Sequence, residues 1–261
     1  MFDLTYLSLG AGVQSSAMLV CSNLGLHGVP RADVAIFADT QQEPPWVYET
    51  LERLRAWSEI PVEVCTAGDL LADMSVKGWA NAPLFTRGED GNESMLRRQC
   101  TREYKMAPIE KHVRVRLGYK PRQRIKESVR CLIGISLDEV SRMKESWTRW
   151  ITNAWPLVDA RLYRRDCEAI VDEHLGFKPR RSACVFCPYR SDMEWRRLRE
   201  EHPEQFERAC QADESMRTLT RVGAERPAFV HRSLVSLRDA NFNDSQGAFA
   251  FDGECEGMCG V

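Results

Sequence analysis

The sequence predicts an α/β protein built on a doubly wound parallel sheet. Short apolar runs of strand length alternate with helix-like stretches through the first half of the chain. The first apolar run leads through a tight glycine turn into a helix, and every run has the length of a buried parallel strand. Such alternation is typical of helices packed on the faces of one sheet.

Each element follows from its local pattern. The predicted strands cover residues 4–9, 33–38, 62–66 and 129–135, and the predicted helices cover residues 15–24, 45–57 and 191–201. The first helix should end near Gly25, because glycine adopts the left-handed conformation that closes helices. The second helix carries Pro45 in its first turn, where the missing amide hydrogen costs nothing.

The remaining segments predict less regular structure. Residues 77–92, rich in Gly, Asn and Pro, predict a loop over the carboxyl ends of the strands, where open parallel sheets bind ligands. After Ile135 the pattern becomes irregular, and the last forty residues predict a weakly structured tail. We therefore expect one α/β domain over residues 1–200, and a C-terminal helix with a flexible, cysteine-bearing tail over residues 201–261.

The composition of the 261 residues is that of a globular protein. Hydrophobic residues make up 43% of the chain and charged residues 28%, which excludes disordered, collagen-like and coiled-coil classes. The longest apolar runs are too short to cross a bilayer, and the N-terminus shows no basic-then-apolar leader. We expect a cytoplasmic protein with no membrane partner.

The net charge of −2 conceals a basic block. Residues 97–130 contain twelve Lys or Arg and only three Glu. This block predicts a local polyanion site for nucleotide phosphates or a nucleic-acid backbone. The alternative interpretation is a solvated helix face.

The ten cysteines favour metal or thiol chemistry over disulfides, because no secretion signal accompanies them. Cys21, Cys65 and Cys131 lie in apolar surroundings and are expected to be small core residues. Cys184 and Cys187, separated by two residues, form the strongest metal-binding pattern. A thioredoxin-type redox pair is the alternative, but such a pair would follow a strand directly.

The stretch from residue 8 to residue 16 is suited to holding phosphate. Small residues allow close approach of the anion, amides at a helix N-terminus point toward it, and hydroxyls add donors. The candidate ligands of the phosphate are Ser8, Gly10, Gly12, Gln14, Ser15 and Ser16. A strand-to-helix turn with incidental glycines is the alternative interpretation.

This stretch resembles the pyrophosphatase loop (PP-loop) of the adenine-nucleotide alpha-hydrolase superfamily, usually written Ser-Gly-Gly-x-Asp-Ser. The resemblance is to the phosphoadenosine-phosphosulfate-reductase-like branch. Gly12 and Ser15 match the motif, whereas Gly10, Ala11 and Gln14 replace its first serine, first glycine and aspartate.

Further stretches resemble the same family, in its order, over about residues 5–200. They are Asp39-Thr40, residues 43–48, the Cys...Lys...Pro element at residues 98–108, the Gly-x-Arg...Glu-Ser-x-Arg element at residues 133–142, and Pro156-Leu157. Ser136 stands where the family element has an arginine.

The resemblance implies ATP and Mg²⁺ as ligands of residues 1–200. It assigns Asp39 to the metal or ribose end of the nucleotide, and Lys105 and Arg142 to phosphate contacts. Gly134 belongs to the nucleotide-binding element that also contains Arg142.

The resemblance also implies an iron-sulfur cluster. Cys100, Cys184 and Cys187 match three cysteines of the family's iron-sulfur branch, and Thr101 replaces a fourth. A 4Fe-4S cluster held by three thiolates leaves one iron open, as in similar iron-sulfur tRNA thiolation enzymes. The fourth ligand could be Cys255, Cys259 or Cys167, which are the remaining candidates. Zinc on the same thiolates is the structural competitor.

Three functions are consistent with these features. The first is an ATP-dependent sulfur transferase that adenylates a nucleic acid (tRNA or DNA) or a nucleotide and receives sulfur from a donor protein such as a cysteine desulfurase. The second is a sulfonucleotide reductase in which Cys255, with Cys259 nearby in the tail, attacks the sulfonate. The third is a non-catalytic, zinc-stabilised nucleotide-binding module. Each of the three functions is compatible with a homodimer. We expect the first, with Asp39, Cys255 and Cys259 as candidate catalytic residues.

Overall fold

The structure is a computed structural model that describes residues 2–77, 82–88, 91–217 and 227–242, and its centre is a five-stranded parallel sheet. The strands lie in the order β3 (Val62–Thr66), β2 (Val34–Asp39), β1 (Leu4–Leu9), β6 (Val129–Ile133) and β7 (Ile151–Ala154). All four neighbouring pairs are parallel. The predicted α/β class and the first four predicted strands are therefore confirmed, with shifts of one or two residues at the ends of β2 and β6.

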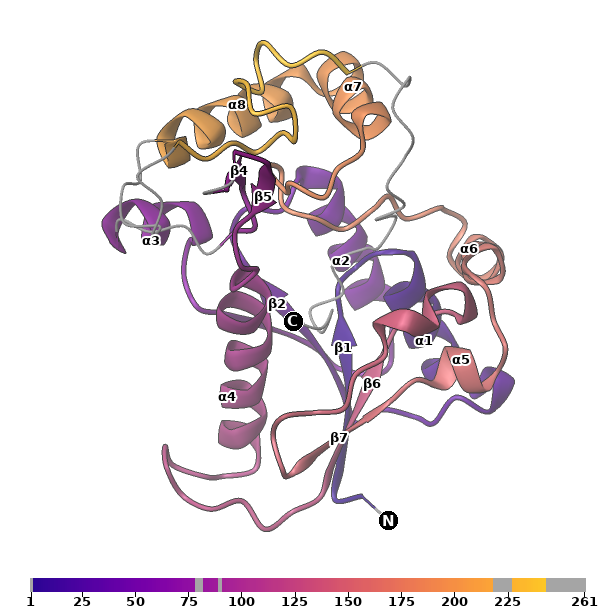
Figure 1. Ribbon diagram of the computed structural model, residues 1–261. Helices are drawn as coiled ribbons and strands as arrows, with labels where there is room; N and C mark the ends of the chain where they lie inside the picture. Colours follow the sequence, from indigo (N-terminus) through magenta and orange to yellow (C-terminus); the bar gives the residue numbers. More distant parts are fainter. Residues whose placement is uncertain (1, 78–81, 89–90, 218–226, 243–261) are drawn as a thin grey trace.

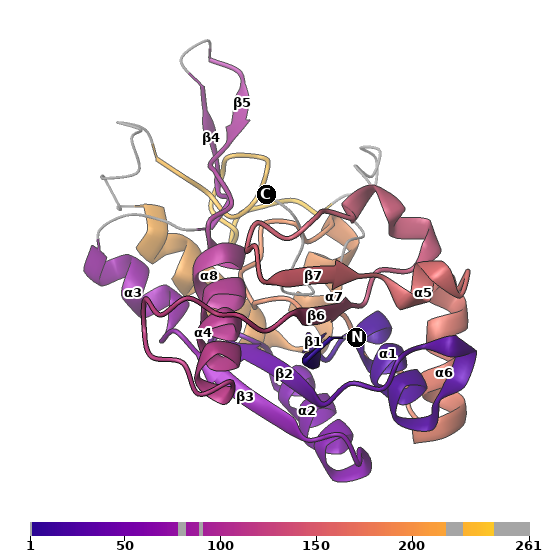
Figure 2. The same cartoon turned by 90° about the horizontal axis from the view of Figure 1, so that it is seen from below.

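Helices cover both faces of this sheet (Figure 2). One face packs against α1 (Val13–Leu24), α2 (Pro45–Trp57) and α6 (Arg164–Leu175), and the other packs against α4 (Ala107–Arg116). Successive residues of β1 point to opposite faces of the sheet. Leu7 packs in the core with α1, and Tyr6 packs in the core with α4. This arrangement is compatible with the predicted doubly wound fold.

A third layer lies across the carboxyl ends of the strands (Figure 1). It contains α3 (Leu70–Lys77), α7 (Asp192–Glu201), α8 (Pro203–Arg217) and the hairpin of β4 (Phe85–Arg87) with β5 (Glu93–Met95). Its apolar core includes Trp195 and Phe242, whose rings stack with centroids 6.5 Å apart. The short elements are η1 (Leu26–Gly28), η2 (Arg102–Met106), η3 (Leu137–Arg142) and α5 (Pro156–Asp159).

Several segments are more ordered than the sequence predicts. The interval after Ile135, predicted to be irregular, contains η3, β7, α5 and α6. It escaped prediction because β7 has only four residues and because α6 buries only three of its twelve residues. The described parts of the loop predicted over residues 77–92 include β4, which pairs with β5.

The segment 227–242, predicted as part of a weak tail, packs into the core of the third layer. Val230, Leu237 and Phe242 are all buried there. Two backbone amides of this segment, those of Val230 and Leu237, donate to the buried carboxylate of Asp213 on α8. A carboxylate on one helix therefore organises a segment that has almost no regular secondary structure.

The strand order reverses between β1 and β6. β1 is hydrogen-bonded to β2 on one side and to β6 on the other, so the connections that leave β1 and β6 run in different directions. Ligands of open parallel sheets bind at the carboxyl ends of strands where the order reverses in this way. No helix in the described part of the chain is long and apolar enough to cross a membrane.

Candidate nucleotide loop and thiol pocket

The turn after β1 adopts a conformation that favours glycine. Ala11 has φ +56°, in the left-handed region, and Gly12 is the N-cap of α1. Ala11 occupies the position where the similar family loop has its first glycine. A side chain at this φ is strained, because the Cβ approaches the neighbouring carbonyl oxygen.

Two amides of the loop are occupied by the loop itself. Ser15 Oγ accepts hydrogen bonds from the amides of Gly10, at 3.2 Å, and Gly12, at 3.3 Å. The Ser15 hydroxyl therefore satisfies both amides in this structure. A phosphate bound here would compete with Ser15 for both donors. The neighbouring Ser16 hydroxyl is buried and has no hydrogen-bond partner among the described residues.

Gln14 links the loop to two other elements. Its Nε2 donates to Glu139 Oε2 at 2.9 Å and to Ser136 Oγ at 3.4 Å, both in the connection after β6. Its Oε1 accepts from Arg164, at the start of α6, at 3.2 Å. Gln14 thus connects the carboxyl ends of β1 and β6, the two strands between which the strand order reverses.

The other predicted nucleotide residues lie along the same edge of the sheet. Gly134 is buried directly after β6, and Arg142 at the end of η3 forms an ion pair with Glu139 at 2.6 Å. Asp39 ends β2, and its Oδ1 accepts from the Gln41 amide at 2.7 Å and from the Tyr48 hydroxyl at 2.9 Å.

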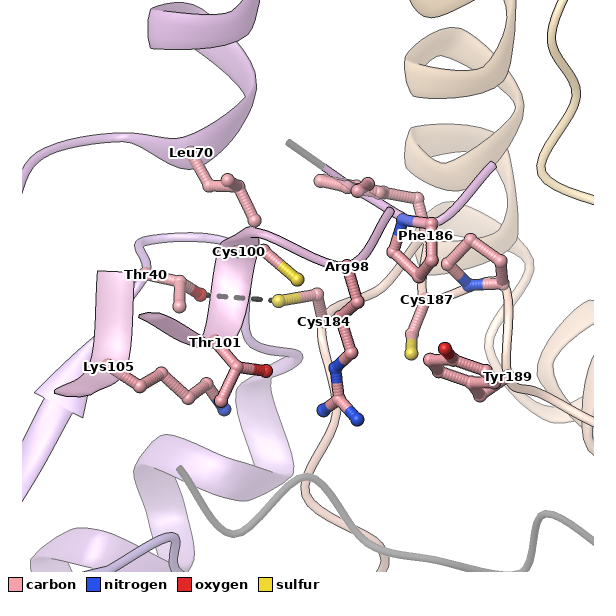
Figure 3. A pocket seen from close by; sticks show the side chains of 13 residues that line it. Thr40, Leu70, Arg98, Cys100, Thr101, Lys105, Cys184, Phe186, Cys187 and Tyr189 are labelled. Carbon is pink, nitrogen blue, oxygen red and sulfur yellow. Dashed lines mark hydrogen bonds between the residues drawn. The ribbon is translucent and has the colours of Figure 1, made fainter. Parts of the chain in front are cut away.

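The three predicted metal-binding cysteines line one pocket (Figure 3). Cys100 precedes η2, whereas Cys184 and Cys187 lie on a turn closed by the Cys187 amide, which donates to the Cys184 carbonyl at 3.0 Å. In Figure 3 the thiols of Cys100 and Cys184 point toward one another, whereas the Cys187 thiol lies on the other side of the Arg98 side chain, beside Tyr189. The pocket contains about 430 Å³ of space, part of it open to solvent.

The three thiols are ligands of the kind that iron-sulfur clusters use, and they line one pocket. Within the described ranges, no three His, Cys, Asp or Glu side chains are close enough together to enclose a single metal ion as they stand. A cluster is a larger body than one ion, so its thiolate ligands are more widely spaced. The pocket also has two cations in its wall, Arg98 and Lys105, which oppose the negative charge of thiolates.

A buried carboxylate that the sequence did not indicate as a site residue joins these groups. Glu43 Oε1 lies 3.2 Å from Lys105 Nζ, accepts from Thr40 Oγ1 at 3.4 Å and lies 3.8 Å from Cys184 Sγ. Lys105, predicted to contact phosphate, is therefore ion-paired beneath the pocket. Glu43 opens the stretch 43–48 that resembles the family and lies four positions after the end of β2, but neither feature marked it as a site residue.

The surroundings of Cys184 favour its neutral form. Burial raises the pKa of the Cys184 thiol well above its ordinary value, and the Glu43 carboxylate raises it further. Lys105 and the hydrogen bond with Thr40 act in the opposite direction. Since a metal replaces the thiol proton, a cluster bound here would reverse this preference.

The other cysteines lie elsewhere. Cys167 is buried on α6 in the core with α1, and Cys210 is buried on α8. Cys21 and Cys131 are fully buried, as predicted for core residues, and Cys65 is partly buried. The predicted catalytic cysteines, Cys255 and Cys259, lie outside the described residues.

The basic block does not form one surface. Arg98 lines the thiol pocket, whereas Arg116 near the end of α4 forms an ion pair with Glu63 on β3. Arg130, near the start of β6, donates to Thr5 on β1 at 3.2 Å. The fold therefore divides between several places the charges that are contiguous in the sequence.

Comparison with known proteins gives no relative for this chain: no family model matches it, and no curated protein matches it. The fold and the candidate site nevertheless define a structural class of protein. The class is a parallel α/β protein that carries a glycine-serine loop and a three-thiol pocket at the carboxyl edge of its sheet.

Proposed function

We propose that this protein is an ATP-dependent sulfur transferase of the adenine-nucleotide alpha-hydrolase kind, acting on a nucleic acid or nucleotide. One observation carries the proposal: three thiols from distant parts of the sequence line one pocket at the sheet edge that also bears the loop after β1. Thiols that deliver or hold sulfur must lie there.

The nucleotide half of the reaction belongs to the loop and its neighbours. On binding, the triphosphate of ATP would take the amides of Gly10 and Gly12 from the Ser15 hydroxyl, at the positive end of the α1 dipole. A substrate oxygen attacks the α-phosphorus, and pyrophosphate leaves with Mg²⁺. Asp39, at the end of β2, is the candidate ligand for that metal or for the ribose. A sulfur nucleophile then displaces AMP from the activated carbon.

The thiol half belongs to Cys100, Cys184 and Cys187, which would hold an iron-sulfur cluster. Held by these three thiolates, such a cluster would supply a coordination position at which sulfide could be bound. The chain's own contribution is electrostatic and steric: Lys105 balances Glu43 below the pocket, and Phe186 and Tyr189 line its wall. These groups limit access of water to the thiols.

The metal is tested by anaerobic purification, followed by iron and sulfide analysis and absorption spectroscopy. We expect a broad visible band that bleaches in air, lost in Cys100→Ser, Cys184→Ser and Cys187→Ser. Cys65→Ser, a change outside the pocket, should retain the band and serves as the matched control. Iron bound equally by all four variants would contradict the assignment of these ligands.

The chemistry is tested by following AMP and pyrophosphate release from ATP in the presence of tRNA, DNA or nucleotides. Ser15→Ala should abolish release, while Ser75→Ala on the exposed side of α3 should not. Absence of AMP formation with every acceptor would overturn the proposal.

The occupied amides of Gly10 and Gly12 favour a second candidate, a non-catalytic module stabilised by zinc. This candidate predicts stoichiometric zinc without iron and no turnover of ATP.

A further inference from the structure

A second cavity, larger than the thiol pocket, lies among α2, α6, α7 and residues 178–181. It contains about 1350 Å³ of space, part of it open to solvent, and we call it the arginine groove. Six Arg or Lys side chains line it, against two Glu. None of these six cations belongs to the block at residues 97–130, so the groove is a separate basic surface.

One wall of the groove carries a buried cation, Arg190, whose charge is opposed by the carboxylate of Glu194 and which lies 5.6 Å from the centroid of the Trp195 ring. Arg190 is only 9% exposed, and one of its terminal nitrogens donates to the carbonyls of Ala183 and Cys184, each at 3.2 Å. Its Nε has no hydrogen-bond partner, and no carboxylate within the described residues forms an ion pair with it. The nearby Glu194 pairs with Arg181 at 2.6 Å. One carboxylate, that of Glu194, therefore faces two guanidinium groups, those of Arg181 and Arg190, and an anion bound in the groove would balance the remaining positive charge.

The groove adjoins both halves of the proposed site. Arg164 lines the groove and donates to Gln14 of the nucleotide loop at 3.2 Å. Arg190 lines the groove and donates to the Cys184 carbonyl of the thiol pocket. A polymer lying in the groove would therefore pass close to the nucleotide loop and to the thiols.

The composition of the groove suits phosphodiesters. Five of its six cations are arginines, whose planar guanidinium groups bind phosphate oxygens in pairs. Trp46 lies in the same wall, with the His202 ring centroid at 4.7 Å and the Arg180 guanidinium at 5.6 Å. Aromatic rings interleaved with arginines are typical of surfaces that hold nucleic-acid strands, because bases stack on them while phosphates bind the cations.

We propose that the arginine groove binds the phosphodiester backbone of the nucleic acid that receives sulfur. This inference rests on the proposed function and names its substrate class as a nucleic acid strand. The groove, rather than the basic block at residues 97–130, is then the docking surface.

The test compares two double charge reversals that change the net charge equally. Lys178→Glu/Arg197→Glu alters two groove residues whose side chains are 68% and 64% exposed, so folding should be little affected. Lys120→Glu/Arg124→Glu alters two exposed residues of the basic block and is the matched control. If the groove reversal fails to fold, Lys178→Ala/Arg197→Ala replaces it.

The probes are fluorescein-labelled single-stranded DNA and RNA of one sequence, titrated by anisotropy at several salt concentrations. Each phosphate contact contributes about 0.7 to the slope of log affinity against log salt. We expect the groove variant to lose about 1.4 of slope and to bind at least about tenfold more weakly at low salt. The control should keep the wild-type slope, and a difference between the two probes identifies DNA or RNA as the source.

Equal binding by the groove variant and the control, or tighter binding of poly-glutamate than of either oligonucleotide, would overturn the inference. The titrations contain no ATP, so they report on the groove even if no AMP is formed. Conversely, binding of a fluorescent ATP analogue should be the same in both variants. Loss of nucleotide binding would therefore be assigned to the loop and not to the groove.

Discussion

Removal of the Lys105 ammonium should destabilise the protein strongly. The side chains of Lys105 and Glu43 are 7% and 1% exposed, with 3.2 Å between Nζ and Oε1. Lys105→Met keeps the volume of the side chain but leaves a buried carboxylate without its cation. Breaking one partner of such a pair costs about 3–5 kcal/mol.

Changing Glu43 and Lys105 together should cost less stability than the two single changes added together. Glu43→Gln retains an acceptor for Thr40, whose hydroxyl lies 3.4 Å from Glu43 Oε1, but leaves the ammonium unpaired. In Lys105→Met/Glu43→Gln no buried charge remains at this position. The double variant should therefore be more stable than the sum of the single changes predicts, by about 2 kcal/mol or more.

Equilibrium urea unfolding, followed by tryptophan fluorescence, measures the free energy of unfolding of the wild type, the two single variants and the double variant. Lys111→Met, on the exposed face of α4, is the control and should change the free energy of unfolding by less than about 0.5 kcal/mol. A cost below about 1 kcal/mol for Lys105→Met, or strict additivity of the two changes, would refute the interpretation of the pair as a buried, coupled unit.

Three further outcomes are expected. Ala11→Gly should stabilise the protein by about 0.5 kcal/mol and Ala11→Val should destabilise it, because φ is +56° at this position; the opposite order in urea unfolding would contradict the strain. Burial raises the pKa of Cys65 and Cys131 to about 12, so both should resist alkylation at about pH 8 until the chain is unfolded. Since the unfolded thiols lose their protons near the ordinary value of 9.0, their contribution to stability should decline as the pH rises from there toward 12. Peptide mass spectrometry after labelling checks the reactivity, and equal labelling in folded and unfolded protein would show the thiols to be accessible. Burial also lowers the pKa of His231, against the opposing hydrogen bond with Asp192, so stability should fall as the pH falls below about 6.5. Thermal unfolding should show a weaker acid dependence in His231→Gln, and an unchanged dependence would exclude this contribution.

Local patterns were sufficient for the elements whose residues are apolar at regular intervals. The helix predicted over residues 45–57 and the strand predicted over residues 62–66 have the observed bounds, and α1 ends at Gly25 with φ +69°. In these segments, periodicity, a proline in the first turn and a closing glycine all agree. The sequence also placed Cys184 and Cys187 together, because both residues lie on one short turn.

Only the tertiary structure decided how distant segments meet. β7 and α6 have too few apolar residues to be recognised alone, and they are defined by pairing with β6 and packing on α1. Glu43 became part of the site through contacts with Lys105 and Cys184, and Arg190 became a buried cation through the fold of residues 181–202. The reason is that burial and long-range hydrogen bonding determine the role of a charged side chain. Both depend on residues that are distant in the sequence, so the neighbouring residues in the chain do not reveal them.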